Sequence, residues 1–229
     1  MNKRLSYMTS HIKTMYGKAG RLGDSQRQYA VMKFAEQYGL VYFTSNKLLP
    51  VSVRAIHGVT SSLGQQDDNI CIGTHNGYDI VFLERTVTIE QGQYPSDTRR
   101  WHIMSFDLHS HQSLPFVFIG TKQQSHAFYA KLFTMRREAR QLDPSFLRVP
   151  THFAANYTVI ASPAEQLMLT QLLTQSVTTT MAKYQYPFAI ELQGDTLFVI
   201  TETRQMNSAS LTKMMHYGLW LARHIDQEI

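Results

Sequence analysis

The stretch that decides the fold runs from Ile70 to Glu84 and reads ICIGTHNGYDIVFLE. Two runs rich in apolar and β-branched residues flank the dipeptide Asn76-Gly77. This dipeptide favours a two-residue hairpin turn, because Asn and Gly adopt a positive φ at low energetic cost. The sequence therefore predicts two antiparallel strands, at 70–74 and 78–84.

Similar patterns extend this prediction along the chain. Short runs of strand-forming residues follow one another with turn residues between them, and a second hairpin is expected around Gly194-Asp195. The further expected strands are 40–44, 86–90, 100–109, 115–121, 153–161, 188–192 and 197–201. Consecutive short strands of this kind form an antiparallel meander, so the predicted class is α+β with a mostly antiparallel sheet.

Helical patterns separate and follow these strands. The clearest start signal is Ser162-Pro163-Ala164-Glu165, which combines a serine cap, a proline at the first helical position and a glutamate placed for a capping box. Other helices are expected from Ser25 to the stop at Gly39, from Ser125 to about residue 141, and from about Ser208 onward. We expect three to four packed helices, of which the C-terminal one is long.

Composition narrows the class of protein. The chain has 229 residues, of which 43% are hydrophobic and 17% charged, and its formal net charge is +5. These values are typical of a folded globular protein. Cys71 is the single cysteine, and its apolar neighbours predict a buried, unreactive thiol. No run approaches the roughly 20 apolar residues that span a bilayer, and no secretory signal is visible, so a cytoplasmic location is expected.

The positive charge is concentrated in residues 1–23, which contain no acidic residue. Apolar residues recur there at spacings of three and four, which predicts a basic amphipathic helix. Such a helix can lie on an anionic membrane, where each basic side chain contributes about 1 kcal/mol. It can equally pack on a partner or on its own domain, which is the commoner outcome for such helices. The expected contact residues are Lys3, Arg4, Leu5, Met8, Ile12, Lys13 and Lys18.

These observations divide the chain into a basic leader, 1–23, and an α+β domain, 24–229. An alternative division separates the domain into lobes at about 24–121 and 122–229. The acidic pair Asp67-Asp68 falls in a segment rich in turn residues, 45–68, which we expect to be a solvated loop.

Sequence motifs for nucleotide binding, zinc proteolysis and serine hydrolysis are missing, which argues against an enzyme. One segment keeps an enzymatic alternative open. If residues 107–111 are extended, Asp107, His109 and His111 lie on one face and form a ligand set for zinc or a similar divalent ion. A metal-dependent hydrolase that uses these three residues is therefore the alternative function. The expected structure of the segment is a solvated strand end that binds no cofactor.

A nucleic-acid surface is the second alternative. Basic residues and an indole that can stack on a base occur together in the set Arg99, Arg100, Trp101, Arg136, Arg137 and Arg140. Basic residues near the end of a helix are also favoured by the helix dipole. Because the excess of positive charge is small, nucleic-acid binding is not the expected function.

The order of these elements resembles that of a group of uncharacterised bacterial proteins. The similar segments are Phe34–Tyr42, Gly77–Phe82, Leu114–Phe118, Phe153–Val159 and Ile190–Leu197, which together cover most of residues 28–225. Members of that group are often domains beside membrane segments and have no established activity. The resemblance implies a membrane-adjacent domain of unknown function and supplies no catalytic residues.

The sequence as a whole favours a non-enzymatic binding or interaction module. We expect it to have an unidentified protein partner and no cofactor. Peripheral attachment to an anionic membrane surface through the leader is part of the same hypothesis.

Overall fold

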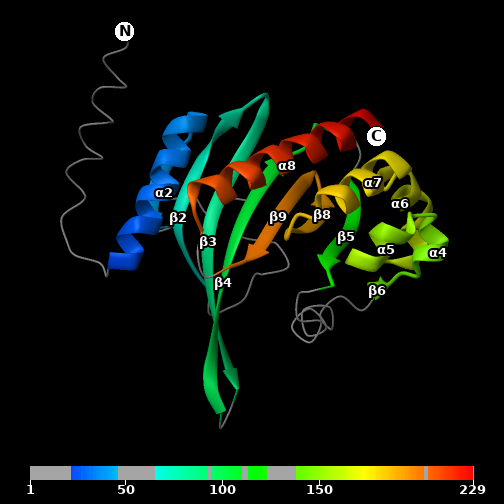
Figure 1. Cartoon of the computed structure of the whole chain (residues 1–229), viewed down its shortest axis with the longest axis horizontal. Coiled ribbons are helices and arrows are strands. Elements are labelled where there is room, and N and C mark those ends of the chain that lie inside the picture. The colour runs from blue at the N-terminus through cyan, green and yellow to red at the C-terminus, as the bar shows by residue number, and fades with distance from the viewer. Residues whose placement is uncertain are drawn as a thin grey trace.

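Nine strands form one sheet in the computed structural model, which describes residues 22–45, 65–91, 94–109, 113–122, 138–203 and 206–228. The strand order is β1-β2-β3-β4-β9-β8-β5-β7-β6, and every neighbouring pair is antiparallel. Helices pack beside this sheet (Figure 1). The predicted α+β class with an antiparallel sheet is therefore confirmed.

The strands have the following bounds: β1 Val41–Ser45, β2 Gln65–His75, β3 Tyr78–Gln91, β4 Tyr94–Asp107, β5 Leu114–Thr121, β6 Arg140–Gln141, β7 Tyr157–Ala161, β8 Ala189–Gly194 and β9 Thr196–Glu202. The α-helices are α2 Leu22–Tyr38, α4 Pro144–Leu147, α5 Thr151–Asn156, α6 Gln166–Leu172, α7 Gln175–Tyr184 and α8 Ser208–Glu228, and a 3₁₀ turn, η3, spans Pro163–Glu165. Within the described part of the chain, no helix is long and apolar enough to span a membrane.

The predicted hairpin at the centre of the opening segment is present. Asn76 and Gly77 have φ values of +52° and +89°, and His75 pairs with Tyr78 across the turn. Beyond the predicted strand, β3 continues without interruption, and β3 and β4 extend past the body of the sheet as a two-stranded ribbon (Figure 1).

The second predicted hairpin, β8–β9, occupies an unexpected position in the sheet. It is inserted in the sheet between β4 and β5, which are consecutive in the chain. Ile103 of β4 pairs with Ile200 of β9, and Ile119 of β5 pairs with Ile190 of β8. Strands from before and after residue 121 therefore alternate in one sheet.

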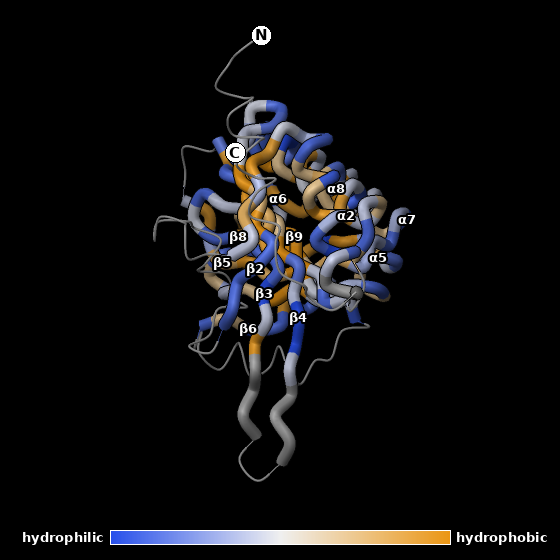
Figure 2. Tube along the Cα trace, turned by 90° about the vertical axis from the view of Figure 1, so that its left-hand side faces the viewer, coloured by the Kyte–Doolittle hydropathy of each residue, from blue (hydrophilic) through white to orange (hydrophobic). Residues whose placement is uncertain are grey.

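Helices α2, α5, α7 and α8 lie to one side of the sheet (Figure 2). Helix α8 crosses the central strands beside α2, and its buried side chains join those of α2 in the larger apolar core. Phe34 of α2 packs at an edge-to-face angle on Phe82 of β3, and Gly218 of α8 lies against the ring of Phe106 of β4. A smaller apolar cluster, which includes Trp101, lies on the opposite face.

Several predicted elements are divided or replaced. The start at Ser162 is confirmed, since its side chain accepts a hydrogen bond from the Ala164 amide, but the helix is interrupted before Thr174, whose side chain caps α7. The predicted strand 153–161 is wrong in its first part, because residues up to Asn156 are helical. Most of the predicted helix 125–141 lies outside the described residues.

Candidate functional site

A polar pocket lies at the end of the helix-covered face, where the β3–β4 ribbon leaves the body of the sheet. Its volume is about 310 Å³, and residues from α2 and from strands β1 to β4 line it. The lining residues are Arg27, Gln28, Thr44, Asp68, Asn69, Glu84, Thr86 and Arg100. Every one of these side chains is polar, so the pocket differs in character from the apolar core beside it.

The sequence of α2 explains why the pocket forms here. Its C-terminal half places Val31, Phe34 and Ala35 in the core, whereas its N-terminal half reads Ser-Gln-Arg-Gln from residue 25. The run from Ser25 to Gln28 has no apolar side chain to place over the end of the sheet. It instead contributes Arg27 and Gln28 to one wall of the pocket.

Three titratable residues form a row beneath this wall. Glu84 of β3 pairs in the sheet register with Asp68 of β2 on one side and with His102 of β4 on the other. Side chains at paired positions lie on the same face of a sheet. Two carboxylates therefore stand directly opposite each other, an arrangement that destabilises a sheet unless other groups compensate.

A chain of hydrogen bonds stabilises the carboxylate of Glu84 and compensates for its repulsion by Asp68. The Tyr42 hydroxyl donates to Asn69 Oδ1 over 2.7 Å, and Asn69 Nδ2 donates to Glu84 Oε2 over 2.8 Å. His102 Nε2 lies 3.2 Å from the other oxygen, Oε1. Both oxygens of a carboxylate that is 4% exposed are thus engaged by fixed partners.

Asn69 reaches this position because of an irregularity in β2. The register between β2 and β3 shifts between Asp68 and Cys71, and Asn69 has a φ of +48°. Asparagine tolerates this left-handed conformation better than most residues with a Cβ atom. The bulge directs the amide of Asn69 between Tyr42 and Glu84, as bulges near binding sites commonly do.

The two carboxyl groups of the row have opposite pKa shifts. Burial by itself raises the pKa of Glu84, but the hydrogen bonds and charge of His102, the amide of Asn69 and the charge of Arg27 bring its pKa below the ordinary value. Burial raises the pKa of Asp68 above its ordinary value; a hydrogen bond from Gln66 opposes this, and the charges of Glu84 and Asp67 add to it. Asp68 therefore ionises less readily in the folded protein than an ordinary aspartate does.

The geometry of this row suits binding better than proton transfer. A general acid or base must contact the proton that it moves. His102 is fully buried and is absent from the pocket lining, and Glu84 already accepts bonds from two fixed groups. The accessible groups are the guanidinium groups of Arg27 and Arg100, the carboxyl of Asp68 and neutral donors and acceptors.

The structure corrects the prediction that Asp67-Asp68 belongs to a solvated loop. Both residues lie in β2, which begins at Gln65. Asp67 is directed to the opposite face, where its oxygens lie 2.7 and 2.9 Å from Nε and Nη2 of Arg85. The side chains of Asp67 and Arg85 are almost completely buried. Asp67 therefore belongs to a buried ion pair, and Asp68 belongs to the pocket.

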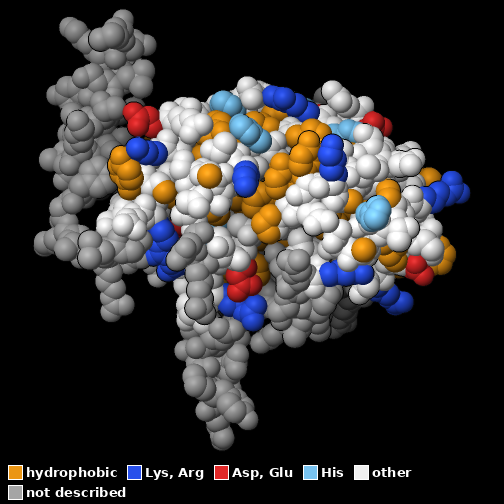
Figure 3. Space-filling model, in the orientation of Figure 1, with side chains coloured by type: hydrophobic (Ala, Val, Ile, Leu, Met, Phe, Trp, Pro, Cys, Tyr) orange, Lys and Arg blue, Asp and Glu red, His pale blue; other side chains and the backbone are white. Residues whose placement is uncertain are grey.

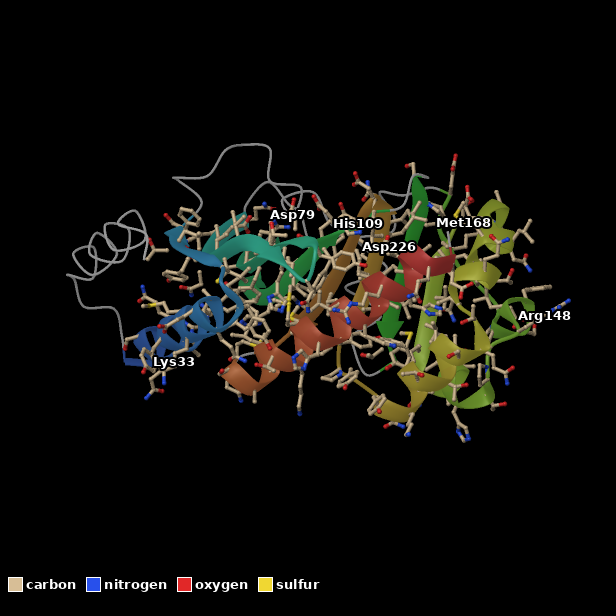
Figure 4. All side chains as sticks on the ribbon, turned by 90° about the horizontal axis from the view of Figure 1, so that it is seen from above. Lys33, Asp79, His109, Arg148, Met168 and Asp226 are labelled. Carbon is tan, nitrogen blue, oxygen red and sulfur yellow. The ribbon has the colours of Figure 1, made fainter. Side chains whose placement is uncertain are left out.

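The predicted metal ligands are found in another part of the fold, at the end of β4. The ring of His109 stacks on Tyr78, its Nε2 lies 3.1 Å from the Gly77 carbonyl oxygen, and its Nδ1 lies 3.6 Å from Asp226 of α8. Figure 4 shows His109 and Asp226 next to each other. His111 lies outside the described residues, among which no group of three or more His, Cys, Asp or Glu side chains is placed to hold a metal ion.

The residues of the predicted nucleic-acid surface are dispersed where they are described. Trp101 is fully buried, and Arg99 and Arg100 alternate between the two faces of β4. Arg140 lies on β6, at the far edge of the sheet from β1. Figure 3 shows basic and histidine side chains spread over the face that α8 crosses. Arg136 and Arg137 lie outside the described residues.

The contact residues predicted for the leader, Lys3 to Lys18, also lie outside the described residues. Sequence patterns alone do not predict the pocket. The available signal is the pair Glu84-Arg85, which places two charges inside an otherwise apolar strand run. Alternation along β3 puts these side chains on opposite faces, and each face then needs a buried partner.

Comparison with known proteins identifies a similar fold but no matching family. No model of a known protein family matches the chain, and no curated protein matches it significantly. The structure is similar to the crystal structure of the mycobacterial trehalose monomycolate transport factor A, with a TM-score of 0.54 and 10% sequence identity. The similarity covers 88% of this chain and 93% of that one. At this identity it shows a common fold.

Proposed function

We propose that this protein is a non-enzymatic binding module that acts as an accessory factor at a membrane surface. The observation that carries the proposal is the position of α2 in the chain. In the sequence the basic leader comes immediately before this helix, which begins at Leu22, and the second turn of the helix places Arg27 in the polar pocket. A leader bound to anionic lipid therefore holds the pocket close to the membrane surface.

Two further findings support this role. The reactive groups in the pocket are those of a recognition site, because the buried His102 has no access to a ligand there. The fold is similar to that of a protein named as the mycobacterial trehalose monomycolate transport factor A. An accessory role in moving or organising membrane components, together with a partner protein, belongs to the proposal.

Liposome co-sedimentation tests the membrane part. The full chain is compared with a full-length variant that carries K3Q, R4Q, K13Q and K18Q, and with a control variant that carries K122Q, K183Q, K213Q and R223Q at exposed positions of the domain. Each cation near an anionic surface contributes about 1 kcal/mol, so the leader variant should lose most of its binding to phosphatidylglycerol vesicles. The control variant should retain its binding.

Two results contradict the proposal. One is equal retention of the wild-type chain and the leader variant by these vesicles. The other is the failure of the wild-type chain to bind them at low ionic strength, where attraction between exposed charges is strongest.

A further inference from the structure

We propose that the polar pocket binds a small zwitterion, whose phosphate or carboxylate group contacts Arg27 and Arg100 and whose ammonium group contacts Asp68. The inference deepens the proposed role as a binding module and does not depend on the leader. It names the chemical class of the ligand.

The balance of charge in the pocket is the first argument. Two guanidinium groups and two carboxyl groups line it, so the pocket carries both signs in equal number. A ligand with one charge would leave an excess charge in a partly buried site, which is costly. A zwitterion offers a partner to each sign and leaves the total charge unchanged.

The second argument is the composition of the walls. None of the eight lining residues is aromatic or aliphatic. Sites for nucleobases use aromatic stacking, and sites for acyl chains are mostly apolar. The volume of about 310 Å³ is at the lower end of the range for small-molecule pockets. The walls and the size together select a small, polar ligand.

The third argument is the arrangement of Asp68. It faces Glu84 across the sheet, while the oxygens of Glu84 are held by Asn69 and His102. Asp68 Oδ2 accepts a bond from Gln66, which is an exposed residue of the same strand. Asp68 is therefore the carboxylate of the row that can exchange an outer contact for a ligand ammonium, with the negative charge of Glu84 behind it.

The anionic end of the ligand is assigned to the two arginine residues of the lining. Arg27 comes from α2, and Arg100 comes from β4, where it pairs across the sheet with Thr86. Guanidinium groups bind phosphate and carboxylate through two parallel hydrogen bonds. The side chains of Gln28, Thr44 and Thr86 add neutral hydrogen-bonding groups to the lining.

Titration calorimetry with the full chain tests the inference. The zwitterionic probes are glycerophosphoethanolamine, which represents a lipid headgroup, and β-alanine, which represents a free amino acid. Ethanolamine and glycerol 3-phosphate carry the separate charged ends. At least one zwitterion should bind, and each separate end should bind about tenfold or more weakly, because one set of charge-assisted bonds is lost.

Matched variants locate the binding. R100Q and D68N should each weaken binding of the zwitterion about tenfold or more. R99Q is the control for R100Q, because Arg99 is the neighbouring residue on the other face of β4. D79N is the control for D68N, because Asp79 is an exposed aspartate of β3. Both control variants should leave the affinity within about twofold of the wild-type value. Thermal melting of each variant shows whether it is folded.

The source of the ligand is read from the probes and from vesicles. A lipid source predicts binding of glycerophosphoethanolamine and greater retention of wild type than of R100Q on vesicles that contain phosphatidylethanolamine. A free metabolite predicts binding of β-alanine without that difference. The inference is overturned if neither zwitterion binds, if a separate end binds as tightly, or if R99Q weakens binding as much as R100Q. Because these titrations contain no membrane, their failure is distinct from failure of the leader to bind lipid.

Discussion

Gly218 of α8 lies directly against the ring of Phe106 on β4, and a Cβ atom at this glycine would overlap two of the ring carbons. The absence of a side chain lets the helix backbone approach the central strands. The close approach is possible because α8 crosses the sheet at β4, where Phe106 is fully buried.

The first prediction concerns this contact. Alanine normally stabilises a helix by about 1 kcal/mol relative to glycine. In G218A the overlap with Phe106 should outweigh this gain and lower the free energy of unfolding by about 1–3 kcal/mol, as overpacking of a core does. Urea denaturation measures the effect. The double variant G218A/F106L should recover part of the loss, and an equal or higher stability of G218A alone would show that the contact is loose.

The buried pair Asp67–Arg85 should respond differently to single and double replacement. D67A leaves the Arg85 charge buried without its carboxylate partner, and we expect a loss of about 3–5 kcal/mol. Replacing both residues by apolar ones of similar size, as in D67L/R85M, should cost much less, because no charge stays buried. Denaturation of the two variants distinguishes these cases. A double variant as unstable as D67A would contradict the expectation.

Asp68 should lower the stability of the free protein at neutral pH. Its pKa is raised in the folded state, so the folded protein holds this proton more tightly than the unfolded chain, and stability decreases as the pH rises through the raised pKa. D68N removes the ionisable group and should be more stable than the wild type at neutral pH. The difference should shrink below the ordinary pKa of an aspartate. D79N, measured by the same melting curves, is the control.

The contribution of Glu84 to the free energy of unfolding should depend on pH in the opposite direction. Its pKa is lowered in the folded state, so its contribution to stability is present above the ordinary pKa of a glutamate and is lost as the pH falls through the folded value. E84Q should flatten this acidic part of the stability profile. It should also cost about 1–3 kcal/mol at neutral pH, because His102 loses a charged partner. An unchanged acidic profile would exclude Glu84 as its source.

Cys71 should react with alkylating reagents at the rate of unfolding. The thiol is fully buried, and burial strongly raises its pKa, so little thiolate is available for reaction. Iodoacetamide labelling, followed by mass spectrometry along a urea gradient, should parallel the loss of structure. Labelling well before the unfolding transition would indicate local opening of β2.

Local sequence signals predicted those parts of the fold that depend on local chemistry. The turn at Asn76-Gly77 and the cap at Ser162 are recognisable because the special conformation is required by neighbouring atoms alone. The region before Tyr157 was misread because Phe153 and Tyr157, both buried, are spaced to suit either one face of a strand or one face of a helix. Its helical state is decided by packing on α7.

Local sequence signals do not predict which distant segments of the chain become neighbours in the fold. The insertion of β8–β9 between β4 and β5 joins residues that are far apart in the chain, and nothing in either segment specifies its neighbour. The pocket depends on the same kind of information. Asp68, Glu84 and Arg100 belong to different strands, and a bulge at Asn69 sets their final arrangement.

The position of α8 in the chain has a consequence for folding during synthesis. The helix follows all nine described strands, yet its buried side chains cover the centre of their apolar face. Strands that pair before α8 is available therefore leave Phe106 and its neighbours without their cover. Such exposed apolar surface favours aggregation, so the nascent chain should be a substrate for chaperones until α8 has emerged.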